Sequence, residues 1–375
     1  ILKARNLGLL HDLGQLTRAL QSASALAELV PYRERILSVC GQLQSTATRN
    51  LDDLALGQDQ ILEDVLSNTQ QIMQYVRLIS ARLAAPVLRA APADRLSLAT
   101  IGWTHRQHSI TASIPPAFAD GDCSVWPFVQ IAPIYFFPCL EQRGLLYQAL
   151  FFHEFGHLLY VCHKQEMDDL VGELQREVED VLMPPSQRND RHADVQAAQR
   201  QTIVDTWYRW AQELFCDAVG LTIGGPCFLL AFSGYLGTMQ RGDFYRQPSD
   251  LEHSEHPVTW LRMRLLVERA RASGFEDLAA EVERDWNAVA RTMGVAADYH
   301  GFYDDALSAA LARTIDDMLT EAEPRRCSDS EASGQGLNAQ SDSLVGLLNE
   351  AWRVYRSDPG AYAQWEHRAL GRILG

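Results

Sequence analysis

Apolar residues recur at spacings of three and four along most of the chain, a period that predicts amphipathic helices. Residues 1–92 follow this pattern, with Pro31 and Pro86 as the expected helix breaks. The pattern returns over residues 258–322 and again over residues 343–375. The chain is therefore predicted to be mostly helical, with a helical region at each end.

Residues 95–138 interrupt the helical pattern with short β-prone runs. The runs at 97–101, 108–114 and 125–132 are bounded by Pro, Gly and Asp, which is typical of strands joined by turns. Pro127 suits an edge strand, because proline has no N–H to donate to a neighbouring strand. We therefore predict a small β-sheet and an α+β fold class that is mostly helical.

Two histidines and a glutamate follow within an apolar run, in the sequence His153-Glu154-Phe155-Gly156-His157. Residues four apart share a helix face, so His153 and His157 can offer two imidazole nitrogens to one metal ion. Glu154 lies about 100° around the same turn, where it can take a proton from a metal-bound water. This is the HExxH arrangement of zinc-dependent peptidases. The alternative is a core helix whose histidines bond to backbone carbonyls; the cost of burying these groups without partners favours the metal.

A tetrahedral catalytic zinc needs a third protein ligand, and two residues compete for this role. Glu213 lies on a second predicted helix and shares a face with Asp217. Glu213 would bind the metal, and Asp217 would hold the second ring nitrogen of His153. His163 matches the spacing of HExxHxxGxxH, but that motif needs glycine where this chain has Tyr160. A helix that continues through Tyr160 turns His163 away from the metal and makes it a helix C-terminal residue, so Glu213 is the favoured ligand.

With both helices in place, the chain resembles the gluzincin group of zinc metallopeptidases, which carry HExxH and a downstream Glu-x-x-x-Asp. The stretch from His256 to Arg262 further resembles the His-Pro-x-x-x-x-Arg element of the M48 family of HtpX-like peptidases. The resemblance covers residues 125–265. It implies that His256 and Arg262 stabilise the oxyanion, and that an edge strand at 125–132 pairs with the substrate backbone.

The helical pattern and the composition also predict a domain organisation around this catalytic domain. We expect a zincin-like catalytic domain over residues 93–322, with the small β-sheet before the HExxH helix and a charged, solvated insert at 164–205. Helical extensions are expected at 1–92 and 343–375, and a flexible linker at 323–342, which is rich in Ser, Gly and charged residues.

The implied function is that of an intracellular endopeptidase, in which Zn²⁺ is the cofactor, a zinc-bound water attacks the peptide bond and Glu154 is the general base. The implied partner is a protein or peptide substrate. The N-terminal helical extension is interpreted either as a plain packing bundle, which its apolar stripes favour, or as a module for a regulatory protein partner that activates the enzyme. Tyr299 and His300 are additional candidates for an oxyanion donor. Two alternatives stay open: a binding or scaffold protein with a zincin fold that has lost turnover, and a helical structural protein whose HExxH is accidental.

Composition narrows the setting of this chemistry. The net charge of −15 and the lack of a basic cluster argue against nucleic acid and anionic membranes as partners. Seven scattered cysteines without a CxxC pair argue against a cysteine-based zinc site and favour the cytoplasm. The run 218–240 carries no charge, but Gly224-Gly225-Pro226 interrupts it. We predict two short buried helices there and no stable membrane insertion.

Overall fold

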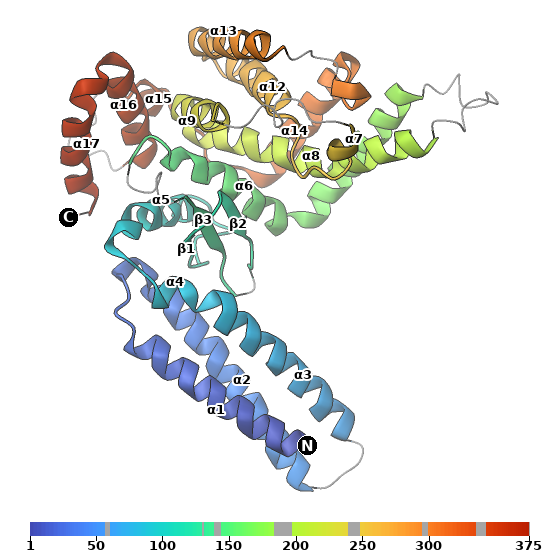
Figure 1. The fold of residues 1–375 in the computed structure, drawn as a ribbon, viewed down its shortest axis with the longest axis vertical. Coiled ribbons are helices and arrows are strands. Elements are labelled where there is room, and N and C mark those ends of the chain that lie inside the picture. The colour runs from blue at the N-terminus through green and yellow to red at the C-terminus, as the bar shows by residue number, and fades with distance from the viewer. Residues whose placement is uncertain are drawn as a thin grey trace. The chain divides into compact units, whose positions relative to one another are not determined.

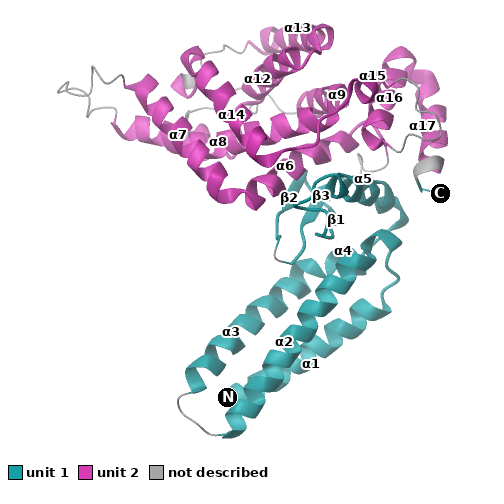
Figure 2. Cartoon of the chain, turned by 180° about the vertical axis from the view of Figure 1, so that it is seen from behind, with its two compact units in different colours: residues 1–143, 374 teal, residues 144–373, 375 magenta. Residues whose placement is uncertain are grey.

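The computed structural model has a mostly helical fold with one small β-sheet, which confirms this part of the prediction (Figure 1). It describes residues 1–56, 61–129, 131–138, 144–183, 197–238, 248–294, 299–334 and 343–374. The chain divides into two compact units, which are residues 1–143 with Leu374 and residues 144–373 (Figure 2). The HExxH motif belongs to the second unit.

Three long helices form most of unit 1. They are α1 (Leu2–Ser22), α2 (Val30–Leu56) and α3 (Leu62–Leu78), and each contacts the other two. Leu13 and Ile36 lie fully buried among them. The predicted helical region at the start of the chain is confirmed, because its apolar stripes form the core of this bundle.

Shorter helical elements complete the helical part of unit 1. Pro31 lies in the first turn of α2 and Pro86 in the first turn of α4. Backbone N–H groups in a first turn have no acceptor within the helix, so the N–H that proline lacks costs no hydrogen bond there. Both predicted breaks are therefore helix starts. The shorter elements are a 3-10 turn (Ala27–Leu29), a π-helical turn (Ile79–Leu83), α4 (Ala85–Leu88), a second 3-10 turn (Pro92–Asp94) and α5 (Arg95–Arg106).

A buried polar layer crosses the three long helices. The amide of Asn6 donates to Oγ1 of Thr69 at 2.9 Å, and the amide of Asn50 donates to Oδ1 of Asn6 at 3.1 Å. All three side chains are buried. A buried amide that loses its partner costs about 1–3 kcal/mol, so this layer holds the helices in one register.

The sheet of unit 1 has three strands in the order β1-β3-β2. β3 (Ile134–Phe137) pairs in parallel with β1 (Ala117–Asp120) and antiparallel with β2 (Ser124–Trp126). β2 is therefore an edge strand, and it ends directly before Pro127. The predicted strand at 125–132 is thus present only at its beginning.

The predicted strands at 97–101 and 108–114 are wrong. Residues 97–101 lie in α5, and turns occupy 108–114. Thr100 and Thr104 explain the error, because they are buried in α5 and their hydroxyls donate to backbone carbonyls one turn earlier, at 3.0 and 2.9 Å. A threonine hydroxyl that is hydrogen-bonded to its own helix can face the core. Polar residues then occupy core-facing positions, and the sequence no longer shows the apolar spacing that identifies a helix.

The compact units divide at 143/144, whereas the sequence predicts a boundary at 92/93. Residues 93–143 belong with the long helices because polar contacts tie them together. Nε of Arg95 lies 3.1 Å from Oε1 of Glu28, and Nε of Arg35 donates to the carbonyl of Ile131 at 3.2 Å.

The described elements of unit 2 are all helical. The predicted helices over 258–322 are confirmed. In chain order the elements are a 3-10 turn (Gln148–Leu150), α6 (Phe151–Cys162), α7 (Lys164–Leu182), α8 (Ala197–Gly224), α9 (Pro226–Leu236), α11 (Pro248–Leu251), α12 (Thr259–Ala272), α13 (Glu276–Met293), 3-10 turns at Tyr299–Gly301 and Asp305–Leu307, α14 (Ser308–Ala322), α15 (Asp329–Ser333), α16 (Leu344–Ser357) and α17 (Pro359–Leu374).

The charge-free run at 218–240 contributes to two buried helices with the predicted break between them. α8 ends at Gly224 and α9 begins at Pro226, and Gly225 between them has a φ of 60°, which favours glycine. α8 is longer than predicted, since it begins at Ala197. None of the helices in the described ranges is long and apolar enough to cross a membrane.

The charged insert predicted at 164–205 is helical, but its described part is not a solvated excursion. α7 buries Met167, Val171, Leu174 and Val178, and the helix contacts α8 and α14. Its charged residues cover only the opposite side. Residues 184–196, which include the remainder of the predicted insert, lie outside the described residues.

The flexible linker predicted at 323–342 is wrong over its first half. The backbone N–H of Cys327 donates to the carbonyl of Thr222 at 2.8 Å, and α15 follows with Ser328 as its N-cap. Turn-forming and charged residues here build a capped helix on the body of unit 2. Residues 335–342 lie outside the described residues.

The C-terminal helices are part of unit 2. In α16, Oδ1 of Asn349 accepts a hydrogen bond from the N–H of Cys227 at 2.8 Å, while its Nδ2 donates to the carbonyl of Gly224 at 3.1 Å. Trp352 donates its indole N–H to the carbonyl of Leu146 at 2.8 Å. α16 therefore fixes both the corner between α8 and α9 and the segment that enters α6.

His105 gives unit 1 a pH-dependent stability. Its ring nitrogens lie 3.1 Å from the carbonyl of Ile114 and 2.9 Å from the hydroxyl of Tyr135. Burial lowers the pKa of His105 to about 4. Between about pH 6.5 and pH 4, the unfolded chain therefore binds a proton that the folded chain does not.

We predict that the free energy of unfolding of unit 1 decreases by up to about 3 kcal/mol as the pH falls from 6.5 to 4, because of His105. Chemical denaturation of the full chain across this range measures the effect. The variant His105→Gln should show a shallower pH dependence than the wild type. Equal slopes for the two proteins would contradict this role of His105.

Candidate metal centre

α6 carries the HExxH residues, and its position in the core follows from its composition. The helix is apolar around most of its circumference, and Phe151, Phe152 and Phe155 are fully buried. His153 and Glu154 are only 6% and 4% exposed, so they have little access to bulk water. Polar groups at this depth need partners, which come from α8.

α6 and α8 pack unusually closely at Gly156. A Cβ atom at this position would lie 2.8 Å from Cα of Cys216, which is shorter than real contacts allow. Glycine therefore permits a backbone approach that any other residue would prevent. Glu213 and Asp217 flank Cys216 on α8, so the approach at Gly156 brings both carboxylates to the histidines.

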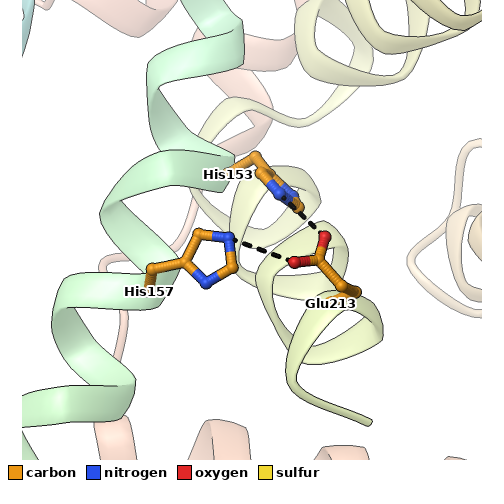
Figure 3. Close-up of side chains that lie close together, drawn as sticks. All are labelled: His153, His157 and Glu213. Atoms are coloured by element: carbon orange, nitrogen blue, oxygen red, sulfur yellow. Dashed lines mark ion pairs between the residues drawn. The ribbon is translucent and has the colours of Figure 1, made fainter. Parts of the chain in front are cut away.

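His153, His157 and Glu213 converge on one point between the two helices (Figure 3). Nε2 of His153 lies 3.4 Å from Oε2 of Glu213, and Nε2 of His157 lies 3.4 Å from Oε1. One atom from each of the three residues falls within 4.8 Å of the other two. In the described part of the chain, these three residues form the group able to hold a metal ion.

These separations fit a shared metal ion better than direct hydrogen bonds. Donors bound at about 2.0–2.1 Å in a tetrahedron lie about 3.3–3.4 Å apart, whereas N–H···O bonds have a heavy-atom distance of about 2.7–3.2 Å. Oε2 of Glu213 is buried and lies 3.3 Å from both Nη2 of Arg262 and Nε2 of His256, but neither contact has the geometry of a hydrogen bond. The donor set therefore contains an unsatisfied oxygen, and a cation between the three residues would satisfy it.

Asp217 holds the other side of His153. Its Oδ1 lies 2.9 Å from Nδ1 of His153, so Nε2 is the nitrogen that faces Glu213. Arg262 of α12 donates through Nε and Nη2 to the two oxygens of Asp217, at 2.9 and 2.7 Å. Arg262 is only 6% exposed. Asp217 therefore lies between His153 and a buried guanidinium.

Phe232 of α9 contacts both ends of this arrangement. Its ring stacks on His153 with a centroid separation of 5.8 Å and an interplanar angle of 25°. The guanidinium carbon of Arg262 lies 4.9 Å from the same ring centroid. The imidazole therefore has the Asp217 carboxylate 2.9 Å from its Nδ1 edge and Phe232 stacked on its face.

The charges of this centre leave room for a divalent cation. Glu154, Glu213 and Asp217 are almost completely buried and bring three formal negative charges, while Arg262 brings one positive charge. Two negative charges remain, and uncompensated buried charge is strongly destabilising. A divalent cation would balance them.

The pKa values of these residues show the same demand for positive charge. Burial lowers the pKa of the His153 imidazolium, but the contacts with Asp217 and Glu213 outweigh burial and raise this pKa to about 10. For Glu213 and Asp217, burial raises the carboxyl pKa, yet neighbouring His and Arg side chains bring both pKa values below their usual range. Without a metal, a proton on His153 supplies part of the missing charge.

His256 lies at the outer side of this centre. Its Nε2 is 3.3 Å from Oε2 of Glu213, and its side chain is 49% exposed. The sequence named His256 and Arg262 together, but the two differ in environment. His256 is half open to solvent beside the metal-binding group, whereas Arg262 is buried behind it.

The other candidates lie elsewhere. α6 continues through Tyr160, and His163 caps its C-terminus, where Nδ1 lies 3.4 Å from Oε1 of Glu321. His163 is therefore not near the histidine pair. The ring of Tyr299 packs against Trp260 and Tyr303 and is 4% exposed. The side chain of His300 lies outside the described residues.

Sequence reasoning missed two residues that shape this centre. Gly156 occupies a variable position of HExxH, and only its place between two ligands in a buried helix signals a close helix contact. Phe232 is part of the charge-free run, whose apolar pattern indicates burial without indicating a partner. Neither residue carries polar chemistry, so a search for ligands does not find it.

No family model matches the chain, and neither a curated protein nor a solved structure matches it. The gluzincin resemblance therefore stays a prediction that depends on the residues of the site.

We predict that Gly156→Ala destabilises unit 2 by about 1–3 kcal/mol, because the added Cβ must push α6 away from α8. The same displacement should weaken metal binding by moving Glu213 from the histidines. Thermal unfolding and metal titration measure the two effects.

Gly172→Ala is the matched control, since Gly172 lies inside α7 with open space at its Cβ position. Removing a helical glycine there should be neutral or stabilise the protein by up to about 1 kcal/mol. Equal stability of both variants would contradict the close approach at Gly156.

Proposed function

We propose that the protein is a zinc-dependent endopeptidase of the gluzincin type. The observation that carries the proposal is the set His153, His157 and Glu213, whose atoms stand at the spacing of a tetrahedral site around an unsatisfied carboxylate oxygen. Two imidazoles and one carboxylate are the donor set of catalytic zinc in peptidases, and three protein ligands leave the fourth position open.

A bound zinc ion would lower the pKa of a water molecule to about 7 and polarise the scissile carbonyl group. Glu154 would act as the general base, since it follows His153 directly on α6 and is shielded from bulk water. It would accept the proton of the attacking water and transfer it to the leaving amine.

His256 is the proposed donor to the oxyanion. It combines a position 3.3 Å from a ligand oxygen with a half-exposed side chain, so it can reach both the reacting carbonyl and the solvent side of the site. Arg262 does not fit this role, because Asp217 already occupies its Nε and Nη2 donors and the side chain is buried. The family-implied role is therefore retained for His256 alone.

Replacing Glu154 with glutamine tests the reaction. We predict that Glu154→Gln keeps zinc but cleaves a peptide library at least about 100-fold more slowly than the wild type, because the amide cannot accept the proton. Mass spectrometry of the digest measures cleavage. Zinc-loaded wild-type protein that shows no Glu154-dependent cleavage would instead support a binding or scaffold protein.

Replacing the two competing ligands tests the metal assignment. We predict that Glu213→Ala weakens zinc binding by at least about 100-fold, since it removes a direct ligand, and that His163→Ala changes it less than about twofold. A chelator competition assay measures both. The opposite order would restore the HExxHxxGxxH interpretation.

A further inference from the structure

Arg262 is a buried guanidinium of the centre that lies against two carboxylates, those of Asp217 and Glu213. It comes from α12, whereas the metal-binding residues come from α6 and α8. Its guanidinium makes a two-point contact with Asp217, at 2.9 Å through Nε and 2.7 Å through Nη2. Such a forked contact fixes both the position and the rotation of a carboxylate.

The orientation of Asp217 in turn determines how His153 is presented. Oδ1 of Asp217 receives Nη2 of Arg262 and also lies 2.9 Å from Nδ1 of His153. A rotation of this carboxylate would release the imidazole edge and change the direction of Nε2. The two-point contact with Arg262 restricts rotation of the Asp217 carboxylate.

Phe232 completes the constraint from a third direction. It stacks on the imidazole of His153 and lies under the guanidinium of Arg262, at 5.8 and 4.9 Å between centres. Loss of Arg262 would therefore remove one contact from each of the two groups that adjoin His153. The remaining ligands His157 and Glu213 have no comparable contact with Phe232 among the described interactions.

We propose that Arg262 is a positioning residue for the metal centre, which acts through Asp217 to fix the direction of the His153 ligand nitrogen. This inference rests on the proposed metal site but not on peptidase activity. It assigns Arg262 a role in metal affinity and coordination geometry, distinct from the oxyanion role that the sequence resemblance implies.

The test compares Arg262→Met with a control on the same helix. Arg269 lies seven residues further along α12 and pairs with Asp316 at 2.7 Å, so Arg269→Met removes a similar ion pair outside the metal centre. Zinc affinity is measured by chelator competition, and geometry by the visible absorption spectrum of the cobalt(II)-substituted protein. We expect Arg262→Met to lose about 10- to 100-fold in zinc affinity and to change the cobalt spectrum. Arg269→Met should match the wild type in both measurements.

A double-mutant cycle tests whether Arg262 acts through Asp217. Asp217→Asn should weaken zinc binding by a similar factor. Adding Arg262→Met to it should change the affinity by less than about threefold, because only the looser 3.3 Å contact of Nη2 with Oε2 of Glu213 is then left to lose. If Arg262→Met costs as much in the Asp217→Asn background as in the wild type, the proposal is overturned.

The variant Arg262→Lys separates a loss of positioning from a loss of folding. Lysine keeps the positive charge beside Asp217 but cannot make the forked contact. Arg262 and Asp217 also line a cavity of about 1040 Å³ between α8, α12 and α14. We expect Arg262→Lys to unfold at nearly the wild-type temperature in the metal-free form and still to bind zinc less tightly than the wild type.

The outcomes separate this inference from the proposed function. Wild-type zinc affinity and an unchanged cobalt spectrum in Arg262→Lys or Arg262→Met would overturn the positioning role, even if the enzyme activity fell. Zinc-binding wild-type protein without peptidase activity would overturn the proposed function and leave the positioning role supported by the affinity data. A wild-type protein that binds no zinc would overturn both.

Discussion

The distance between α6 and α8 controls the geometry of the whole centre. The histidines are part of one helix and the carboxylates part of the other, so every separation across the site depends on how closely the two backbones pack. Gly156 sets that distance against Cα of Cys216. The surrounding aromatic core then prevents relaxation, because close-packed interiors transmit small displacements and do not absorb them. A metal site built this way is as rigid as the core that contains it.

Burial concentrates unbalanced negative charge at this centre, which destabilises it. Three carboxylates and one guanidinium are buried at the centre with little solvent, which leaves two negative charges to be balanced. A proton on His153 balances one of them, and the raised pKa of that imidazole reflects this. A divalent cation would balance both and satisfy the free oxygen of Glu213. On the proposed function, the centre would be more stable with a cation than without one, which would couple folding to metal binding.

The sequence predicted the parts of the site that local geometry determines. The helical repeat places His153 and His157 on one face of α6, and Glu213 and Asp217 on one face of α8. It also turns His163 away from the site once α6 continues through Tyr160. It did not predict α5, whose buried threonines hide the apolar period, or the association of residues 93–143 with unit 1. Those features depend on contacts between distant residues such as Arg35 and Ile131, which no local pattern encodes. The change of role for Arg262 has the same origin, since only the three-dimensional contact with Asp217 distinguishes a buried anchor from a substrate-facing donor.

The central claim is that one zinc ion is bound jointly by His153, His157 and Glu213. X-ray absorption spectroscopy at the zinc edge, together with metal analysis of the purified protein, tests it most directly. The account predicts one zinc per chain, with nitrogen and oxygen ligands at about 2.0–2.1 Å and no sulfur. A protein without stoichiometric zinc, or a zinc ion with sulfur ligands, would contradict it.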